Sequence, residues 1–267
     1  MTIALGILAG NSQILAADTQ VSAETEKVSQ GKISFRANFT GRTTGVIAIT
    51  GSGDDFLLRA FQEDLADLFS RTDTENMHEL EAALAGLVKT FYREHIALTP
   101  NMEQRPEVEL IIAARRGNSS GMWVTRKNKL TKAHSPVCVG IGGAYADSLL
   151  ANLELPQQPE TAMLLAAYTV FLVKKRNLYV GMETQVYCLD NSTTIFPKVL
   201  GTAQCRHLEE LFRGCIGVEA KVLHRILGSG YDFCEAERVA GDIEILRKRS
   251  LDFLQPSNPS SSESSQT

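Results

Sequence analysis

Strand-like and helix-like segments follow one another in blocks along this chain of 267 residues. Short apolar segments come first, and two longer segments with one apolar face follow them, at Asp54–Ser70 and Asn76–His95. Strand-like segments then return, and two further helical segments at Ala144–Leu153 and Glu160–Arg176 precede a last strand at Thr184–Asp190. Blocks of this kind favour sheets packed on each other with helices outside them, instead of alternating strand–helix units. We therefore expect an α+β fold.

The earlier strands are predicted from short apolar runs and from the alternation of apolar and polar residues. Gly-Asn between the first two of these segments is typical of a hairpin turn. Residues Gln20–Gly31 form a polar stretch that we expect to be solvated. The predicted strands are Thr2–Leu8, Gln13–Asp18, Lys32–Arg36, Val46–Thr50, Val108–Ala114, Gly121–Thr125 and Pro136–Ile141.

The composition is that of an ordinary globular protein. Apolar residues make up 43% and charged residues 22% of the chain, and 27 Lys and Arg against 31 Asp and Glu give a net charge of −4. No apolar run approaches the roughly 20 residues of a membrane span, and the start lacks the basic region of a secretory signal. Without a block of Lys and Arg, a nucleic-acid or lipid surface is not expected. We expect a cytoplasmic protein with no nucleic-acid and no membrane partner.

The cysteines and histidines form no recognisable metal-binding pattern. The five cysteines are an odd number without a CxxC pair, and the five histidines form no HExxH or HxH motif. A disulfide framework or a zinc site would need closer pairing. We therefore expect reduced thiols, no metal and no cofactor.

Two glycine-rich stretches are not expected to bind a nucleotide. In Gly140–Ala144 the third glycine of the dinucleotide fingerprint is replaced by Tyr145, and after Gly51–Gly53 it is replaced by Phe56. The fingerprint also belongs at a leading strand–helix unit, which neither stretch follows.

Thr2 is the residue on which the functional prediction depends. Because Met1 precedes a small residue, we expect Met1 to be removed, leaving Thr2 with a free α-amine beside its own hydroxyl. An α-amine titrates at about 7.7–8.0, close enough to neutrality to act as a general base. Thr2 would then supply both the nucleophile and the base.

A spaced motif surrounds Thr2. Asp18 follows it by 16 residues, at the end of the segment Gln13–Asp18. This arrangement resembles the start of proteasome β-type subunits and of the related bacterial protease HslV, where an N-terminal Thr is followed by the Asp of a hydrophobic-Ala-Ala-Asp strand end. A strand lysine before an aliphatic residue also belongs to that pattern. Lys32 matches it, and Lys27 is the alternative.

Three later segments extend the resemblance to about residue 190. Ile49–Asp55 is similar to the Ala-Gly-Gly-x-x-Asp turn, with Gly51 at the position of the oxyanion glycine. Val139–Ala146 is similar to the family's glycine-rich strand-to-helix turn, and Leu164–Gly181 resembles its later helix and the turn after it. The resemblance implies the four-layer αββα sandwich of the N-terminal nucleophile hydrolases.

Three positions around the nucleophile depart from the pattern of the family. Asn177 stands where proteasome subunits carry Asp, and Val180 stands where they carry Ser. Gly143 replaces another supporting Ser, as it does in HslV-like members. The resemblance implies a hydrogen-bond network around the nucleophile that holds a water molecule and transfers a proton. These three changes affect that network.

The resemblance implies a role for each matched residue. Thr2 attacks an amide carbonyl, Lys32 lowers the pKa of the Thr2 hydroxyl, and Asp18 keeps Lys32 charged and oriented. The Gly51 backbone N–H donates to the developing oxyanion. No cofactor is implied.

Three functions are compatible with this sequence. The first is a threonine peptidase that cleaves peptides or unfolded protein inside a ring-shaped homo-oligomer. The second is an amidohydrolase of a small amide, and the third is a non-catalytic ring or scaffold protein comparable to proteasome α-type subunits. We predict the first, because a scaffold has no use for a nucleophile at the start of the chain. The sequence does not identify an ATPase or activator partner.

Beyond residue 200 the sequence becomes mostly helical. We expect a hydrolase domain at residues 1–200, a helical extension packed on it at residues 201–254, and a tail at residues 255–267. The tail has no apolar residue, so it cannot offset its ordering entropy and is expected to be disordered. The helices of the extension are predicted at Thr202–Arg213, Gly217–Leu227 and Phe233–Leu254.

Overall fold

The structure is a computed structural model, and it describes residues 2–23, 26–38, 44–72, 76–101, 103, 105–134, 136–151, 153–190, 196–227, 241 and 244–245. For residues 22, 23, 26, 27 and 218–227 it describes the backbone alone. The chain divides into two compact units, residues 1–206 and 207–267.

The strands all belong to the first unit. They are β1 (Ala4–Ala9), β2 (Ser12–Asp18), β3 (Gln20–Ala23), β4 (Glu26–Ser29), β5 (Ser34–Asn38), β6 (Gly45–Gly53), β7 (Val108–Arg116), β8 (Ser119–Arg126), β9 (Lys129–Lys132), β10 (Val137–Val139), β11 (Thr184–Leu189) and β12 (Lys198–Leu200). The helices are α1 (Asp55–Arg71), α2 (Met77–Phe91) with the π-helical turn η1 (Tyr92–Ile96), α3 (Gly143–Ala151), α4 (Pro159–Arg176) and α5 (Thr202–Leu227), which runs from the first unit into the second.

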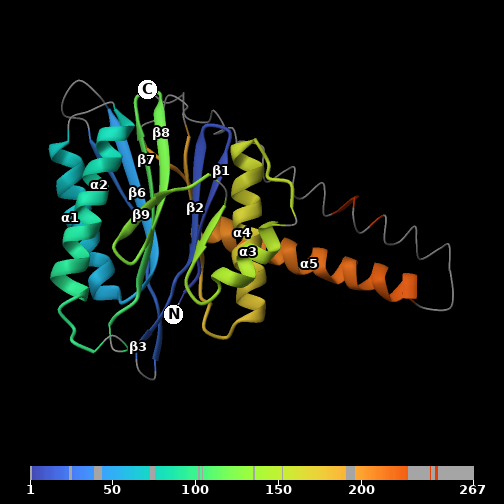
Figure 1. Ribbon diagram of the computed structural model, residues 1–267. Helices are drawn as coiled ribbons and strands as arrows, with labels where there is room; N and C mark the ends of the chain where they lie inside the picture. Colours follow the sequence, from blue (N-terminus) through green and yellow to red (C-terminus); the bar gives the residue numbers. More distant parts are fainter. Residues whose placement is uncertain are drawn as a thin grey trace, which may run out of the picture. The chain divides into compact units, whose positions relative to one another are not determined.

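Two antiparallel five-stranded sheets lie face to face in the first unit (Figure 1). One has the strand order β10-β1-β2-β11-β12, and the other has the order β5-β6-β7-β8-β9. Helices α3 and α4 pack on the first sheet, and α1 and α2 pack on the second (Figure 1). The predicted four-layer αββα sandwich is therefore confirmed.

The strands β1 and β2 are apolar along nearly their whole length because both of their faces are covered. Seven successive residues of β2 are buried. A cluster of buried side chains that includes Ala4, Leu15, Ala48 and Ile111 fills the space between the sheets. A second cluster joins the other sheet to α1 and α2.

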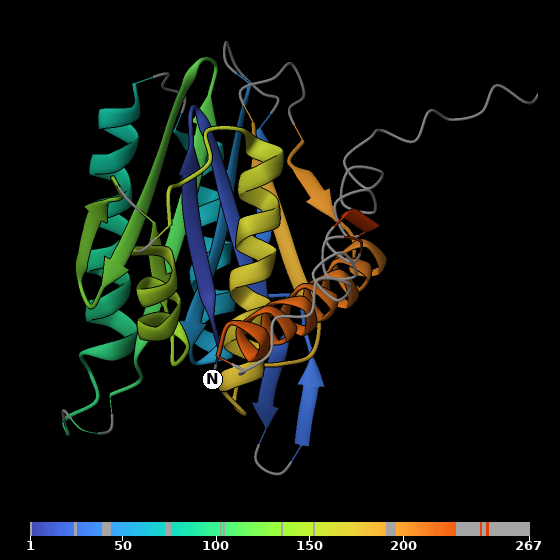
Figure 2. The ribbon, with the colours of Figure 1, turned by 90° about the vertical axis from the view of Figure 1, so that its right-hand side faces the viewer.

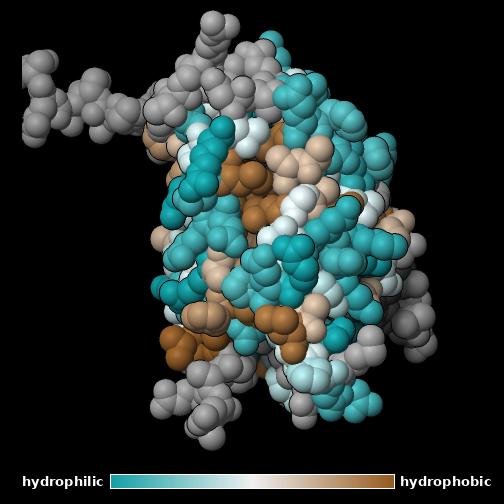
Figure 3. Space-filling view, turned by 60° about the vertical axis from the view of Figure 1, so that its left-hand side comes forward, coloured by the Kyte–Doolittle hydropathy of each residue, from teal (hydrophilic) through white to brown (hydrophobic). Residues whose placement is uncertain are grey.

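Helix α1 shows how the sequence places a helix on a sheet. The side chain of Asp54 caps its first turn by accepting a hydrogen bond from the backbone N–H of Leu57 at 3.1 Å. Buried residues recur every four positions along the helix, at Leu57, Phe61, Leu65 and Phe69, so one face packs on the sheet. Figure 3, which brings the α1–α2 side of Figure 1 forward, shows a mostly hydrophilic surface with a few separate hydrophobic patches.

The structure corrects two of the sequence predictions. The polar stretch Gln20–Gly31 contains the paired strands β3 and β4, and this hairpin extends beyond the ends of the two sheets (Figure 2). The helices predicted at Thr202–Arg213 and Gly217–Leu227 are one continuous helix, α5. Most of the predicted helix Phe233–Leu254 and the whole tail 255–267 lie outside the described residues.

Within the part of the chain that the structure describes, none of the helices combines the length and the apolar character that crossing a membrane requires.

Candidate active site

The register of the first hairpin brings Asp18 to Thr2. Strands β1 and β2 are joined by a tight turn at Gly10 and Asn11, and Ala4 pairs with Ala17. One step further along both strands, the Asp18 backbone N–H donates to the carbonyl oxygen of Ile3 at 3.3 Å. Thr2 therefore lies beside Asp18 although 16 residues separate them, and its hydroxyl donates to Asp18 Oδ1.

Asp18 is a fully buried carboxylate whose two oxygens accept hydrogen bonds from several directions. Besides the Thr2 hydroxyl, Oδ1 accepts from the backbone N–H of Ile3 at 3.0 Å. Oδ2 accepts from the backbone N–H of Gln20 at 3.3 Å and of Gly181 at 3.0 Å. These donors offset the cost of burying the charge and fix the carboxylate in one orientation.

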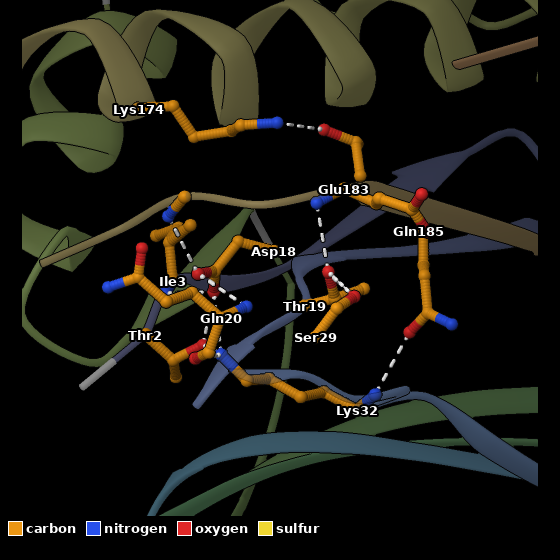
Figure 4. Close-up of polar contacts among 12 residues, drawn as sticks. Thr2, Ile3, Asp18, Thr19, Gln20, Ser29, Lys32, Lys174, Glu183 and Gln185 are labelled. Atoms are coloured by element: carbon orange, nitrogen blue, oxygen red, sulfur yellow. Dashed lines mark hydrogen bonds and ion pairs between the residues drawn. The ribbon is translucent and has the colours of Figure 1, made fainter. Parts of the chain in front are cut away.

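Lys32 reaches the same point from the segment that leads into the other sheet. Its Nζ lies 3.0 Å from Asp18 Oδ1, and it donates to the Thr2 hydroxyl oxygen and to the carbonyl oxygen of Gln20. Figure 4 shows the extended Lys32 side chain ending between Thr2 and Asp18. The Thr2 hydroxyl thus donates to a carboxylate and accepts from an ammonium group.

Burial lowers the pKa of Lys32 below its ordinary value of 10.5 because charge is disfavoured away from water. The negative charges of Asp18, and more weakly of Asp55, act in the opposite direction. The exposed fraction of the Lys32 side chain is 8%. Lys27, the alternative lysine, has its backbone in β4, and its side chain lies outside the described residues.

Gly140 allows a close approach of its backbone to Thr2, and Gly51 allows a close approach between the neighbouring strands β6 and β7. Gly140 has a φ of 90°, and a Cβ there would meet the carbonyl oxygen of Thr2 and would lie 2.9 Å from Cβ of Ser52. A Cβ on Gly51 would lie 2.5 Å from the carbonyl oxygen of Glu109. Only glycine fits at either position without a shift of the backbone.

Gly51 and Lys32 line the same pocket, which has a volume of about 310 Å³. Its apolar wall includes Ile49, Leu58 and Leu110, and its polar rim includes Gln30, Asp55, Arg59 and Gln62. The pocket therefore has room for a side chain of moderate size beside that of Lys32.

The three supporting residues predicted from the family pattern make no hydrogen bond to Thr2 among the described residues, and each has other contacts. Asn177 ends α4, and its side-chain oxygen accepts from the backbone N–H of Tyr179 at 2.9 Å. Val180 is a buried apolar side chain, and the N–H of Gly143 donates to the Gly140 carbonyl oxygen at 2.8 Å. Among the described residues, the structure gives neither Asn177 nor Val180 a side-chain hydrogen bond to Thr2.

The structure adds residues that the sequence analysis missed. The backbone N–H of Gly181 binds Asp18, and Oε1 of Gln185 accepts from the backbone N–H groups of Lys32 and Ile33. Gly181 belongs to the segment Leu164–Gly181, which resembles the family pattern. That resemblance was the sequence feature that could have identified Gly181 as part of the site. Gln185 lies 153 residues from Lys32 in an ordinary strand, and no local pattern marks it. The described residues contain no cluster of side chains suited to hold a metal ion.

Solved structures with this fold include three Anbu proteins. The Anbu Gly-1 mutant from Hyphomicrobium sp. strain MC1 matches with a TM-score of 0.66 and 13% identity, covering 87% of this chain and 100% of that chain. The Anbu complex from Pseudomonas aeruginosa, a helical assembly, matches with a TM-score of 0.68 and 14% identity over 86% and 98% of the two chains. Anbu from Yersinia bercovieri, described as an ancestral β-subunit, has a TM-score of 0.67 and 12% identity over 86% and 99%.

No protein-family model and no curated protein matches the sequence. At 12–14% identity the structural matches establish a shared fold, over nearly the full length of the Anbu chains. The chain therefore has the αββα fold of the N-terminal nucleophile hydrolases, with Thr2, Asp18 and Lys32 in contact at the start of its first hairpin.

Proposed function

We propose that the protein is a threonine-type hydrolase that cleaves peptide bonds with Thr2 as its nucleophile, and that it is a divergent relative of proteasome β-type subunits. This proposal rests mainly on one observation. The Thr2 hydroxyl contacts both Asp18 and Lys32. Asp18 orients the hydroxyl and the Lys32 ammonium group, and that ammonium group stabilises negative charge as it develops on the Thr2 oxygen. The shared fold with the Anbu proteins supports the proposal.

The reaction begins once Met1 has been removed. The Thr2 oxygen attacks the carbonyl carbon of the substrate, and the hydroxyl proton passes to the α-amine of the same residue. The ammonium group of Lys32 stabilises the attacking oxygen, while Asp18 holds that ammonium group in place. The Gly51 backbone N–H donates to the oxyanion of the tetrahedral intermediate.

The second half of the reaction releases the products. The protonated α-amine of Thr2 gives its proton to the leaving nitrogen as the carbon–nitrogen bond breaks, leaving an ester on the Thr2 oxygen. A water molecule then attacks the ester, its proton passes to the α-amine, and the proton returns to the Thr2 oxygen as the acid leaves. No metal or redox cofactor takes part in these steps.

We also propose that the chain acts within a homo-oligomer. A peptidase without a barrier would degrade its own cell, and a nucleophile that faces an enclosed chamber avoids this. The helical assembly of the Pseudomonas aeruginosa Anbu complex supports self-association for this fold. The helix layers on both sides of the sheets offer surfaces for such contacts.

A small-amide hydrolase is the second candidate function, and one observation favours it. Neither Asn177, whose side chain binds its own turn, nor the apolar Val180 gives the site the polar network expected of a proteasome subunit. A site with fewer proton-transfer groups is suited to more reactive amides. This candidate requires neither a ring nor a chamber.

The proposed function is tested on the purified full-length protein. Mass spectrometry of the N-terminus is expected to show Thr2 as the first residue, and short peptide amides are expected to be hydrolysed. Light scattering coupled to size exclusion is expected to give a mass several times 29.2 kDa. A retained Met1 with no hydrolysis would support the scaffold function, and an active monomer would support the small-amide hydrolase.

The pH dependence of hydrolysis is expected to be bell-shaped. The acidic side should follow the α-amine of Thr2, which accepts a proton when neutral and has an ordinary pKa of about 7.7–8.0. The basic side should follow Lys32, which acts as a cation, and its midpoint should lie below 10.5 because burial lowers the pKa of this lysine. The measurement is kcat/KM against pH for a short peptide amide.

Lysine variants assign the basic side of that profile. Lys32→Ala is expected to abolish hydrolysis, whereas Lys27→Ala is expected to leave both the rate and the profile unchanged. If hydrolysis instead increases as pH rises through the basic range, Lys32 acts in its neutral form and the proposed role as a cation is wrong.

A further inference from the structure

The segment that carries Lys32 has no strand partner for its own backbone. Residues 30–33 lie between β4 and β5 and belong to neither strand, so their N–H groups need acceptors outside the strand ladders. Gln185, on β11 of the opposite sheet, supplies one side-chain oxygen to two of these groups. Its Oε1 accepts from the backbone N–H of Lys32 at 2.9 Å and of Ile33 at 3.3 Å.

We propose that Gln185 is a positioning residue for catalysis, which fixes the backbone of Lys32 so that its ammonium group reaches Thr2. The proposal rests on the proposed function, in which that ammonium group stabilises the attacking oxygen. Gln185 itself contacts neither Thr2 nor the pocket beside Lys32 among the described contacts.

The register of the sheet explains why Gln185 and Asp18 act together. Strands β2 and β11 are antiparallel neighbours, in which Asp18 pairs with Thr184 and Ala17 pairs with Gln185. Asp18 holds the tip of the Lys32 side chain, and Gln185 holds its backbone. Figure 4 shows these contacts at opposite ends of the extended lysine. The same sheet therefore fixes both ends of a side chain that comes from the other sheet.

Gly31 leaves space for this contact. A Cβ at Gly31 would lie 3.1 Å from Nε2 of Gln185, which is closer than ordinary packing allows. The other contacts of the segment involve the preceding residue, Gln30. Its N–H donates to the carbonyl oxygen of Thr19 at 2.8 Å, and its side chain donates to Asp55 at 3.0 Å. Gln185 is thus the partner that acts directly on the backbone of Lys32.

Loss of the Gln185 oxygen would leave two amide groups of the segment without their acceptor. The segment would then shift to reach water, and a displacement of about 1 Å at a catalytic group lowers rates on the order of 100-fold. The charged groups that face Lys32 are Asp18 from β2 and Asp55 from α1. Neither would be altered by a change at Gln185, so the effect of the variant reports on position.

The test compares three variants of the full-length protein. Gln185→Met keeps the length of the side chain and removes the acceptor, and Gln185→Glu keeps an acceptor oxygen. Gln13→Met is the matched control, because Gln13 is a buried glutamine at the far end of β2 with a hydrogen bond to the Asn11 carbonyl oxygen. For peptide amides, kcat of Gln185→Met is expected to fall at least tenfold with KM within about twofold. Gln185→Glu is expected to recover most of kcat, and Gln13→Met is expected to keep the wild-type values.

A second measurement does not depend on hydrolysis. The pH dependence of Lys32 acylation by trace acetic anhydride, followed by mass spectrometry, gives the pKa of this lysine in each protein. Because the shifted segment exposes Lys32 to water, Gln185→Met is expected to raise that pKa toward 10.5, and Gln13→Met is expected to leave it unchanged.

The outcomes separate this inference from the proposed function. If wild-type protein hydrolyses peptides and Gln185→Met has an unchanged kcat and Lys32 pKa, Gln185 does not position Lys32. If wild-type protein shows no hydrolysis, the proposed function fails, and the acylation measurement still decides whether Gln185 fixes Lys32. A tenfold fall in kcat that Gln185→Glu does not recover would also overturn the inference, because the acceptor oxygen is then not what matters.

Discussion

Thr2→Ala is expected to abolish peptide hydrolysis while leaving the fold intact. The substitution removes the one oxygen that both Asp18 and Lys32 contact, and those two residues keep their ion pair at 3.0 Å. The rate of an enzyme without its nucleophile typically falls by several orders of magnitude, about 10⁶-fold where a whole nucleophile unit is lost. We expect kcat/KM to fall below about one per cent of wild type.

Thr2→Ser is the matched control for this variant. Serine keeps a hydroxyl and, after removal of Met1, an α-amine, and both replacement residues are small enough for that removal. The measurement is hydrolysis of a peptide amide, together with the mass of the N-terminus and the thermal unfolding of each variant. Activity is expected in Thr2→Ser and not in Thr2→Ala. Substantial turnover by Thr2→Ala would place the nucleophile at another residue.

The contact between Thr2 and Asp18 was predictable because a hairpin converts spacing into proximity. The tight turn at Gly10 and Asn11 fixes the pairing of β1 with β2, so the residues near the two open ends meet. The amphipathic helices were predictable for a similar local reason. Helix α1 was expected at Asp54–Ser70 and is found at Asp55–Arg71, since its cap and its periodic apolar face lie within the segment itself.

Other features depend on pairing that no local pattern encodes. The strands β3 and β4 have four residues each and pair mainly with each other, so they were taken for a solvated stretch. The sequence favoured Lys32 but kept Lys27 as an alternative, because the choice depends on where the hairpin places the following segment. Gln185 joins the site only because β11 pairs with β2, across a separation of 153 residues from Lys32. The family pattern assigned Asn177 to the hydrogen-bond network around the nucleophile, and the contact that the structure gives its side chain is with the backbone N–H of Tyr179.

Asp18→Asn is expected to lower both the stability and the activity of the protein. The fully buried carboxylate accepts from backbone donors as well as from Thr2 and Lys32. An asparagine has one acceptor oxygen, and its NH₂ group would face N–H donors that now bind the second carboxylate oxygen. Lys32 would also lose its counter-charge. Removing one partner of a buried ion pair costs about 3–5 kcal/mol, mainly because the other charge is left uncompensated.

Two further variants test the cause of that loss. Asp67→Asn is the matched control, because Asp67 forms an ion pair with Arg71 in which both side chains are largely exposed, and its loss should cost less than about 1 kcal/mol. In the double variant Asp18→Asn and Lys32→Met the uncompensated charge is gone, so the free energy of unfolding should recover by at least about 1 kcal/mol relative to Asp18→Asn alone.

Activity and stability are expected to separate in this series. The double variant regains stability but lacks the ammonium group that contacts the Thr2 hydroxyl, so it should remain inactive. Urea unfolding of each protein and hydrolysis of a peptide amide measure the two effects. If the double variant is as unstable as the sum of the two single variants, Asp18 and Lys32 contribute independently, and the ion pair does not organise the site. If Asp18→Asn keeps wild-type activity, Lys32 does not need its buried partner, and the proposed arrangement of the nucleophile is wrong.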